Sequence, residues 1–241
     1  MKLFRKKCSI IDLTWPLSET STIYPGDSTV KIEDESTIVE DGFATTRLSF
    51  NNHTGTHIDY PLHFFADGSS SSNFNIQEMF DLETLVLDFS SDTEKTRISA
   101  NDISRKIDGS RLDNFRAVIF KTKNCGIDLS NSTFTDNYTA LDIEAANFVL
   151  ERFPNIGFVG IDYLSIDLPS CHDLSVHKIF LKSNVCILTG LKLDEIEAEH
   201  CQISISPLRI EHANGAPIRC IARPHSQGCC KRIAEILGGP R

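Results

Sequence analysis

The sequence predicts a mixed α/β or α+β domain that is rich in strands and has few helices. Residues 85–87, 117–120 and 158–159 are short runs of apolar residues only, as expected for strands that are covered on both faces. The clearest helical periodicity lies at residues 140–153, where apolar side chains recur three or four positions apart. Buried strands combined with such a helix indicate a sheet with helices packed against it.

The predicted strands are short segments rich in β-branched and aromatic residues and bounded by turn-forming residues. They lie at residues 9–13, 45–50, 84–89, 116–121, 156–162, 185–189, 203–210 and 218–222. In the second segment, Thr46, Leu48 and Phe50 alternate with polar residues, which is typical of a strand. We expect this strand to deliver the residues that follow it to the edge of a sheet.

Two helices and one loop complete the predicted elements. The helix at 140–153 carries apolar residues on one side (Ile143, Ala146, Val149, Leu150 and Phe153). Thr139 and Asp142 resemble a capping box at its start. A shorter helix is expected at 100–107, with Ser99 or Asn101 as its cap. The serine-rich segment 69–75 predicts a surface loop, close enough to the histidine-rich segment at 53–64 to form its rim or lid.

Composition limits the class of protein. A chain of 241 residues with 40% hydrophobic and 24% charged residues is typical of an ordinary globular protein, and we expect residues 1–241 to form one domain. The net charge of −9 argues against nucleic acid or an anionic membrane as the main partner. No apolar stretch is long enough to span a bilayer, and none has the position of a signal peptide. We therefore expect a cytoplasmic location.

The eight cysteines fit that compartment, because their spacing shows no pairing. Cys186, for example, lies in an apolar segment and is expected to be a buried, reduced thiol. His225, Cys229 and Cys230 lack the C-x-x-C spacing of structural zinc sites. We expect residues 224–241 to be a tail without a function of its own.

The segment from His53 to Phe64 is the most informative part of the chain, with three histidines and one aspartate within eleven residues. In an extended chain His57 and Asp59 point to the same face, and Gly55 allows a bend that brings His53 beside them. Two imidazoles and a carboxylate suit a first-row metal with open positions for water and substrate. Without a metal, these buried polar groups would each need another partner.

The same segment resembles the HxGTHxDxPxHF pattern of the metal-dependent cyclase-like hydrolases, the group that includes bacterial kynurenine formamidase and isatin hydrolase. Further segments resemble that family in the same order along the chain, over about residues 9–223. They are Asp12–Thr14, Tyr24–Asp27, Gly160–Asp167, His177–Leu191, Ser206–Ile210 and Gly215–Arg219. The resemblance implies a swivelling β/β/α fold, a barrel-like mixed sheet with helices on one side. It also implies a homodimer or homotetramer, in some members with an N-terminal segment that reaches a neighbouring active site.

The resemblance implies that His53, His57 and Asp59 bind the first metal. In the two-zinc members Asp59 would bridge to a second ion, whose other ligands correspond to His177 and position 189. This chain has Thr189 where those enzymes have glutamate, and a neutral hydroxyl is a poor replacement for a carboxylate ligand. We therefore expect one tightly bound ion, Zn²⁺ or Mn²⁺, with a second ion absent or weakly bound. His177 would then face the substrate, support the ligands or be purely structural.

The resemblance gives His63 the role of catalytic general acid/base, which suits an imidazole because its ordinary pKa lies near neutrality. The alternative is a hydrogen bond from His63 to Asp59 that orients this ligand. The implied reaction is metal-assisted hydrolysis of a small aryl-formamide. The alternatives are a lactam or isatin-type cyclic amide as substrate, or a non-catalytic descendant that keeps the metal. The aromatic residues in or near the motifs that could line a substrate pocket are Trp15, Tyr24, Phe64 and Phe65.

Overall fold

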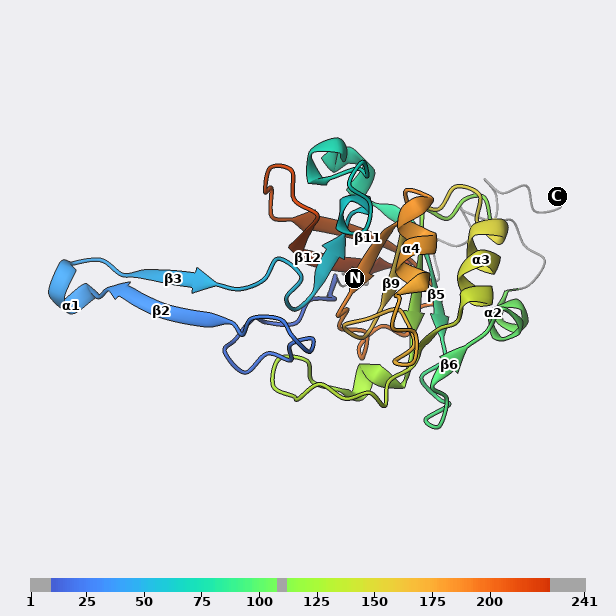
Figure 1. Ribbon diagram of the computed structural model, residues 1–241, viewed down its shortest axis with the longest axis horizontal. Helices are drawn as coiled ribbons and strands as arrows, with labels where there is room; N and C mark the ends of the chain where they lie inside the picture. Colours follow the sequence, from blue (N-terminus) through green and yellow to red (C-terminus); the bar gives the residue numbers. More distant parts are fainter. Residues whose placement is uncertain (1–9, 108–111, 226–241) are drawn as a thin grey trace, which may run out of the picture.

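The computed structural model describes residues 10–107 and 112–225, and its body is a closed barrel with helices on one side (Figure 1). Going round the barrel, the strands are β12 (Gly215–Pro224), β11 (His200–Pro207), β5 (Leu82–Asp88), β7 (Ala117–Lys121), β9 (Phe158–Ile161), β10 (Cys186–Thr189) and β4 (His57–Asp59). The barrel closes because β4 pairs with β10 on one side and with β12 on the other. A short strand, β1 (Ile11–Asp12), adds to β12.

The pairing is mixed, as the family resemblance implies. Strands β5, β7, β9 and β10 run parallel to one another, whereas β4, β11 and β12 join through antiparallel pairs. Residues 117–120 of strand β7 are all apolar because both faces of the strand are buried. Ala117 and Ile119 belong to the core inside the barrel, while Val118 and Phe120 pack in the layer between the barrel and the helices.

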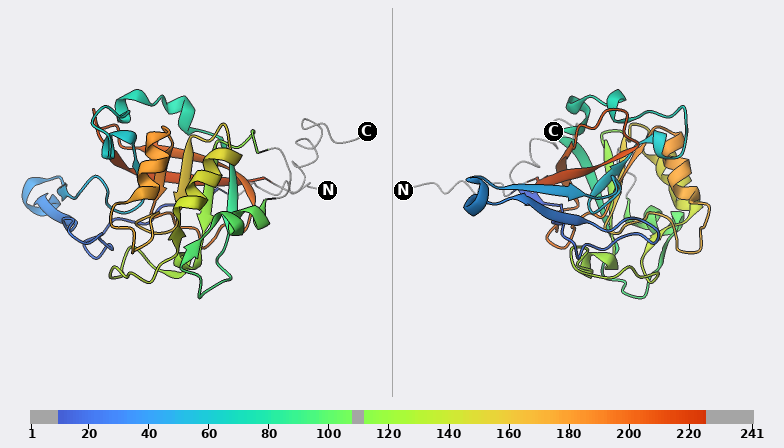
Figure 2. Two further views of the ribbon diagram at one scale, coloured as in Figure 1. Left: turned by 45° about the vertical axis from the view of Figure 1, so that its right-hand side comes forward. Right: turned by 60° about the vertical axis from the view of Figure 1, so that its left-hand side comes forward.

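Three helices cover one face of the barrel: α2 (Ala100–Lys106), α3 (Ile143–Arg152) and α4 (Ser175–Lys182) (Figures 1 and 2). The predicted α2 is confirmed, with Ser99 as its cap in a capping box with Asp102. The predicted start of α3 is wrong. Residues Ala140–Leu141 form strand β8, which pairs with β6 (Arg97–Ile98), and the helix cap is Asp142, which accepts a hydrogen bond from the backbone N–H of Ala145.

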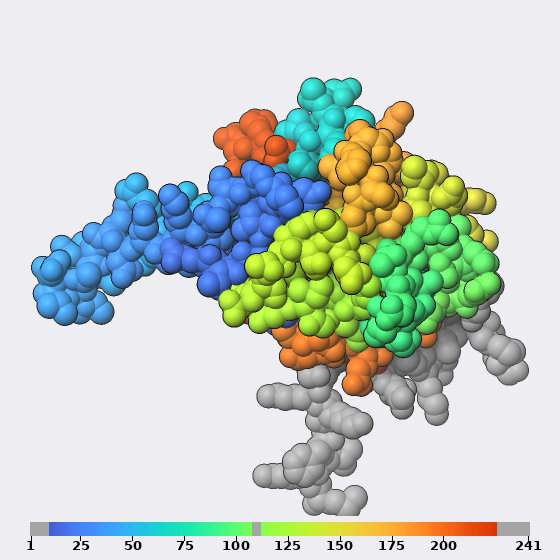
Figure 3. Space-filling view, turned by 60° about the horizontal axis from the view of Figure 1, so that its bottom comes forward, coloured from blue at the N-terminus to red at the C-terminus, as the bar shows by residue number. Residues whose placement is uncertain are grey.

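The prediction for segment 45–50 is only partly right. Residues Thr45–Ser49 do form a strand, β3, but this strand pairs with β2 (Lys31–Ser36) instead of joining the barrel. The two strands and a short helix between them, α1 (Ile38–Asp41), form an arm (residues 31–49) that projects from the body (Figure 3). Every residue of β3 is exposed, so the alternation of apolar and polar residues in this strand does not correspond to one buried and one exposed face.

Four short 3-10 helices lie in the connections between the described strands: η1 (Pro61–His63), η2 (Ser71–Asn73), η3 (Ile76–Met79) and η4 (Lys123–Gly126). The predicted loop at 69–75 contains η2, and Ser71 is hydrogen-bonded to the backbone of Ile210 and Ala213. It therefore braces the loop between β11 and β12. That loop begins after Pro207, so the predicted strand 203–210 ends too late.

The described residues include several of the predicted free cysteines and the first residues of the predicted tail. Cys186, Cys201 and Cys220 are buried free thiols, as expected. No helix within residues 10–107 and 112–225 is long and apolar enough to cross a membrane. Of the predicted tail, His225 is hydrogen-bonded to Glu83, whereas residues 226–241 lie outside the described residues.

Candidate metal centre

Strand β4 carries the centre of the site. Ile58 points into the barrel core, so its neighbours His57 and Asp59 face the opposite side. Both are almost fully buried, at 4% and 1% exposure. The expectation that this segment lies at a sheet edge is wrong, because His57 and Asp59 each have a partner on both β10 and β12. Pairing on both sides fixes the direction of the two side chains.

His53 reaches the same place through a bend in the chain. Gly55 has a φ of +67°, a conformation that costs glycine little. The bend returns the His53 ring to β4, where its Nδ1 lies 2.6 Å from Oδ1 of Asp59. Gly215 makes room for this ring, because a Cβ atom there would lie 2.3 Å from Cε1 of His53. The predicted convergence of His53, His57 and Asp59 is therefore confirmed.

The three residues offer a donor set that fits a divalent metal. One donor atom from each of His53, His57 and Asp59 lies within 4.8 Å of the others. Nδ1 of His57 lies 2.9 Å from the carbonyl oxygen of Gly55, and its Nε2 lies 3.4 Å from Oδ1 of Asp59. Donation of the Nδ1 proton to that carbonyl leaves the Nε2 lone pair free to bind an ion. Two imidazole nitrogens and a carboxylate oxygen are ligands that Zn²⁺ and related ions accept.

The electrostatics show how strongly the centre depends on positive charge. Burial disfavours a charged carboxylate, yet the imidazoles of His57, His177 and His53 hold the pKa of Asp59 well below its ordinary value. Burial also opposes charge on His53, but its contact with Asp59 raises the pKa of the ring. Asp59 is therefore a buried anion that needs cationic neighbours, whether protonated imidazoles or a metal ion.

His63 lies beside this group and is not one of its three members. It ends η1, where Pro61 restricts the backbone, and its ring stacks on His53 with the centroids 4.0 Å apart. No hydrogen bond joins His63 to Asp59 among the described contacts. The outer edge of His63 is exposed, but desolvation against the neighbouring rings, reinforced by His53, His177 and His57, lowers its pKa to about 4. This keeps the imidazole neutral near pH 7.

His177 and Thr189 complete the inner wall. His177 lies on α4, and its Nε2 is 3.6 Å from Oδ2 of Asp59. Burial opposes its charge, but contacts with Asp167 and Asp59 raise the pKa of His177 to about 9. Thr189 pairs with His57 across β10 and β4, and its hydroxyl lies 2.9 Å from Nε2 of that ring. Position 189 therefore faces the centre.

Two residues of the site were missed by sequence reasoning. Asn214 lies 3.0 Å from Nε2 of His53 through its side-chain oxygen, and Asp167 lies 2.5 Å from Nδ1 of His177. Asp167 ends one of the motif segments, so the signal was present, but nothing in the sequence says which side chain it meets. Asn214 lies in a loop 161 residues after His53 in the sequence, so no local pattern indicates their contact.

The four aromatic residues predicted to line a pocket have different places. Phe64 and Phe65 both pack against the core between barrel and helices, and the ring of Phe64 also lies 5.6 Å from that of His177. Tyr24 is in edge contact with Phe134. Burial and then the charge of Asp167 raise the pKa of Tyr24. Trp15 packs in an aromatic cluster with Tyr163 and is bonded through its backbone N–H to Thr56.

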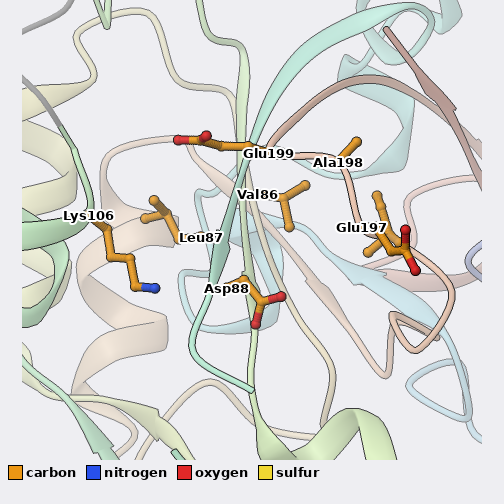
Figure 4. Close-up of a pocket in the computed structure, with 8 residues that line it drawn as sticks. Val86, Leu87, Asp88, Lys106, Glu197, Ala198 and Glu199 are labelled. Atoms are coloured by element: carbon orange, nitrogen blue, oxygen red, sulfur yellow. The ribbon is translucent and has the colours of Figure 1, made fainter. Parts of the chain in front are cut away.

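Two cavities lie elsewhere on the surface. The smaller, of about 230 Å³, lies between β5 and the segment 196–199 and is lined by Lys106 and by the carboxylates of Asp88, Glu197 and Glu199 (Figure 4). The larger, of about 930 Å³, lies between segment 71–79 and the segment 207–211. Neither is lined by His53, His57, Asp59 or His63, so the candidate centre is separate from both.

Fold and site together define an α/β barrel protein whose strand β4 presents a histidine- and aspartate-based candidate metal centre. The chain belongs to the family described as "Putative cyclase", whose model matches residues 11–168. The matched region includes the whole segment from His53 to His63.

Individual relatives agree with this assignment. The chain is 27% identical over 216 residues to a kynurenine formamidase of Bacillus anthracis, covering 89% of this chain and 97% of that protein. A solved structure described as a potential metal-dependent hydrolase with cyclase activity is 25% identical and superimposes with a TM-score of 0.74. The match covers 90% of this chain and 99% of that structure's chain. An isatin hydrolase bound to thioisatinate shares the fold, with a TM-score of 0.75, 20% identity, and coverage of 89% and 91%.

Gly215 provides a test of the site geometry that leaves every donor residue in place. Gly215→Ala should push the His53 ring away from Asp59, because the new Cβ would overlap it. We expect metal affinity to fall by about 10- to 100-fold, the usual cost of disturbing a residue that orients a ligand. Gly126→Ala is the matched control, since a Cβ there meets nothing within 4 Å. Equal affinity in both variants, measured by competition with a chelating dye, would contradict the described position of His53.

Proposed function

We propose that the protein is a metal-dependent amidohydrolase that cleaves the C–N bond of a small aryl-formamide, as its resemblance to kynurenine formamidases suggests. The observation that carries the proposal is the convergence of His53, His57 and Asp59, with the neutral ring of His63 stacked at their side. Free buried thiols such as Cys186 support a cytoplasmic location for this activity.

In this proposal His53, His57 and Asp59 hold one Zn²⁺ or Mn²⁺ ion. When bound, such an ion supplies Lewis-acid polarisation and lowers the pKa of a coordinated water towards neutrality. The chain contributes the fixed arrangement of donors. Hydrogen bonds that the two imidazoles donate, from His57 to the Gly55 carbonyl and from His53 to the side-chain oxygen of Asn214, orient both rings.

His63 is the proposed general acid/base. Its lowered pKa keeps it neutral near pH 7, so the ring can accept a proton from water and later return it to the leaving nitrogen of the amide. The ring of His63 stacks directly on the ring of His53, which is one of the three donor residues. Phe64, which lies beside His177, is the proposed apolar wall against which an aryl group would pack, and Tyr24 and Trp15 are proposed to extend it.

A lactam or isatin-type cyclic amide is the second candidate substrate, and Thr189 is the observation that favours it. Its hydroxyl faces the centre at 2.9 Å from Nε2 of His57, where the two-zinc formamidases are expected to have a carboxylate. A site with a single ion is therefore proposed, which departs from the formamidase pattern. The third possibility, a metal-binding protein without catalysis, differs from both by the absence of turnover.

A combined assay tests the proposed function. Purified protein is analysed for metal content and then incubated with aryl-formamides, lactams and isatin. We expect about one equivalent of Zn²⁺ or Mn²⁺ per chain, as the donor set implies, with turnover of an aryl-formamide that a chelator abolishes. Bound metal without turnover of any of these compounds would support the non-catalytic alternative. Absence of bound metal would refute the centre itself.

The role of His63 is tested by His63→Ala. We expect metal content to stay the same while turnover falls by about two to four orders of magnitude, the usual contribution of a positioned acid/base. His212→Ala is a suitable control, because this histidine is exposed on the loop between β11 and β12. If metal is lost together with activity, His63 is a ligand and the assignment is wrong.

Thr189→Glu tests whether the centre can hold two ions. The new carboxylate would lie on β10 opposite His57, and together with Asp59 and His177, whose side chains lie 3.6 Å apart, it would offer the carboxylate oxygens and imidazole nitrogen that suit zinc. At saturating zinc we expect metal content to rise towards about two equivalents per chain. Thr20→Glu is the control, because it makes the same substitution at an exposed position. A folded Thr189→Glu protein that still binds one ion would exclude His177 as part of a second site.

We also propose that the chain forms a homodimer or homotetramer. The supporting observation is the arm (residues 31–49), which exposes Ile38, Val39, Phe43 and Leu48 to between 59% and 94%, although an isolated two-stranded ribbon is marginally stable in water. Light scattering should give at least twice the mass of the chain. The pair of substitutions Phe43→Asp and Leu48→Asp should reduce it, whereas Ile143→Asp on α3 should not. A monomeric wild-type protein would contradict this proposal.

A further inference from the structure

Asp167 is a completely buried carboxylate for which the proposed reaction has so far no use. Its side chain is 0% exposed, and it ends the motif segment Gly160–Asp167, between β9 and α4. A buried carboxylate is costly unless it is fully hydrogen-bonded. Its partners therefore show what it does.

Three hydrogen bonds reach the side chain of Asp167 from the first turn of α4. Its Oδ1 accepts the backbone N–H of Val176 at 2.7 Å, and its Oδ2 accepts that of His177 at 3.0 Å. The residue in the N-cap position, Leu174, is in the left-handed conformation and provides no side-chain cap. Asp167 thus satisfies N–H groups that the helix itself leaves unpaired.

The third contact goes beyond the helix backbone. Oδ2 of Asp167 also lies 2.5 Å from Nδ1 of the His177 ring. A carboxylate bonded to two N–H groups acts as an acceptor, so the proton of this contact lies on Nδ1. The other ring nitrogen, Nε2, then faces Oδ2 of Asp59 at 3.6 Å.

Asp167 is itself held firmly. Its backbone N–H donates to Oγ of Ser165 at 3.2 Å, and its carbonyl oxygen accepts the hydroxyl proton of Tyr138 at 2.9 Å. A backbone bridge joins it to Leu141. The carboxylate is therefore fixed with respect to the sheet as well as to α4.

We propose that Asp167 is a positioning residue of the centre: it holds the His177 ring so that Nε2, and not Nδ1, faces Asp59. The inference rests on the proposed function only where it assigns a consequence for turnover. It gives the motif Gly160–Asp167 a task, because the segment delivers from the end of β9 the carboxylate that orients a residue on the next helix. Removing Asp167 should disturb the centre although it does not touch Asp59.

Asp167→Ser separates this role from simple helix capping. Serine is a favoured N-cap residue and keeps an acceptor for the first turn, but its shorter side chain lacks the second oxygen that bonds the ring. We expect turnover of the substrate found by the assay above to fall by about 10- to 100-fold, as for other residues that orient a site histidine. Asp173→Asn is the matched control, an exposed acid two residues before Ser175 and the start of α4.

A double-mutant comparison tells orientation from stability. If Asp167 acts through His177, Asp167→Ser should cost little further activity in a His177→Ala background. An equal loss in both backgrounds would mean that Asp167 only caps α4, and no loss in the wild-type background would also overturn the proposal.

A measurement independent of activity protects the test against failure of the proposed function. Nitrogen-15 NMR of the histidine rings in the full-length protein should show a proton on Nδ1 of His177, with the downfield proton shift of a strong hydrogen bond. That signal should be lost in Asp167→Ser and kept in Asp173→Asn. Wild-type protein without a proton on this nitrogen, or a signal that persists in Asp167→Ser, would overturn the proposal even if no hydrolysis is ever detected. The wild-type spectrum decides the point should Asp167→Ser not fold.

Discussion

The closure of the barrel by β4 is the constraint on which the rest of the structure depends. A three-residue strand contributes few hydrogen bonds of its own, yet β4 is held by β10 and β12 on its two sides. Because side chains alternate across a strand, fixing Ile58 in the barrel core forces His57 and Asp59 to the helix side. The bend at Gly55 and the space left by Gly215 then bring His53 to the same point. The packing of the core therefore arranges the donors.

Asp59 is the electrostatic centre of this arrangement. A carboxylate that is 1% exposed cannot keep its charge without cationic or hydrogen-bonded partners. Here the partners are His53 at 2.6 Å, His57 at 3.4 Å and His177 at 3.6 Å. Each imidazole is itself oriented by a second group. The side-chain oxygen of Asn214 orients His53, the carbonyl of Gly55 orients His57, and the carboxylate of Asp167 orients His177. Such ordered outer contacts are typical of sites that bind metal ions.

The sequence predicts the parts of this structure that depend on local pattern. The continuous apolar strands β7 and β9, the helix α2 with its Ser99 cap and the grouping of His53, His57 and Asp59 all follow from residues close together in the chain. What could not be predicted depends on distant pairing. Nothing local distinguishes β3, in the exposed arm, from a barrel strand, and β4 owes both its neighbours to segments more than a hundred residues away. Helix α4 was missed because its first turn is capped by Asp167 and not by a neighbouring residue.

We infer that the fold of β4 and its neighbours creates one metal centre from His53, His57 and Asp59. The most direct test is a crystal structure of the protein as purified, with anomalous diffraction measured at the absorption edges of zinc and manganese. We expect an anomalous peak within bonding distance of one nitrogen from each of His53 and His57 and one oxygen of Asp59. A peak bound by other residues, for example by the carboxylates around Asp88 and Glu197, with none at Asp59, would contradict it.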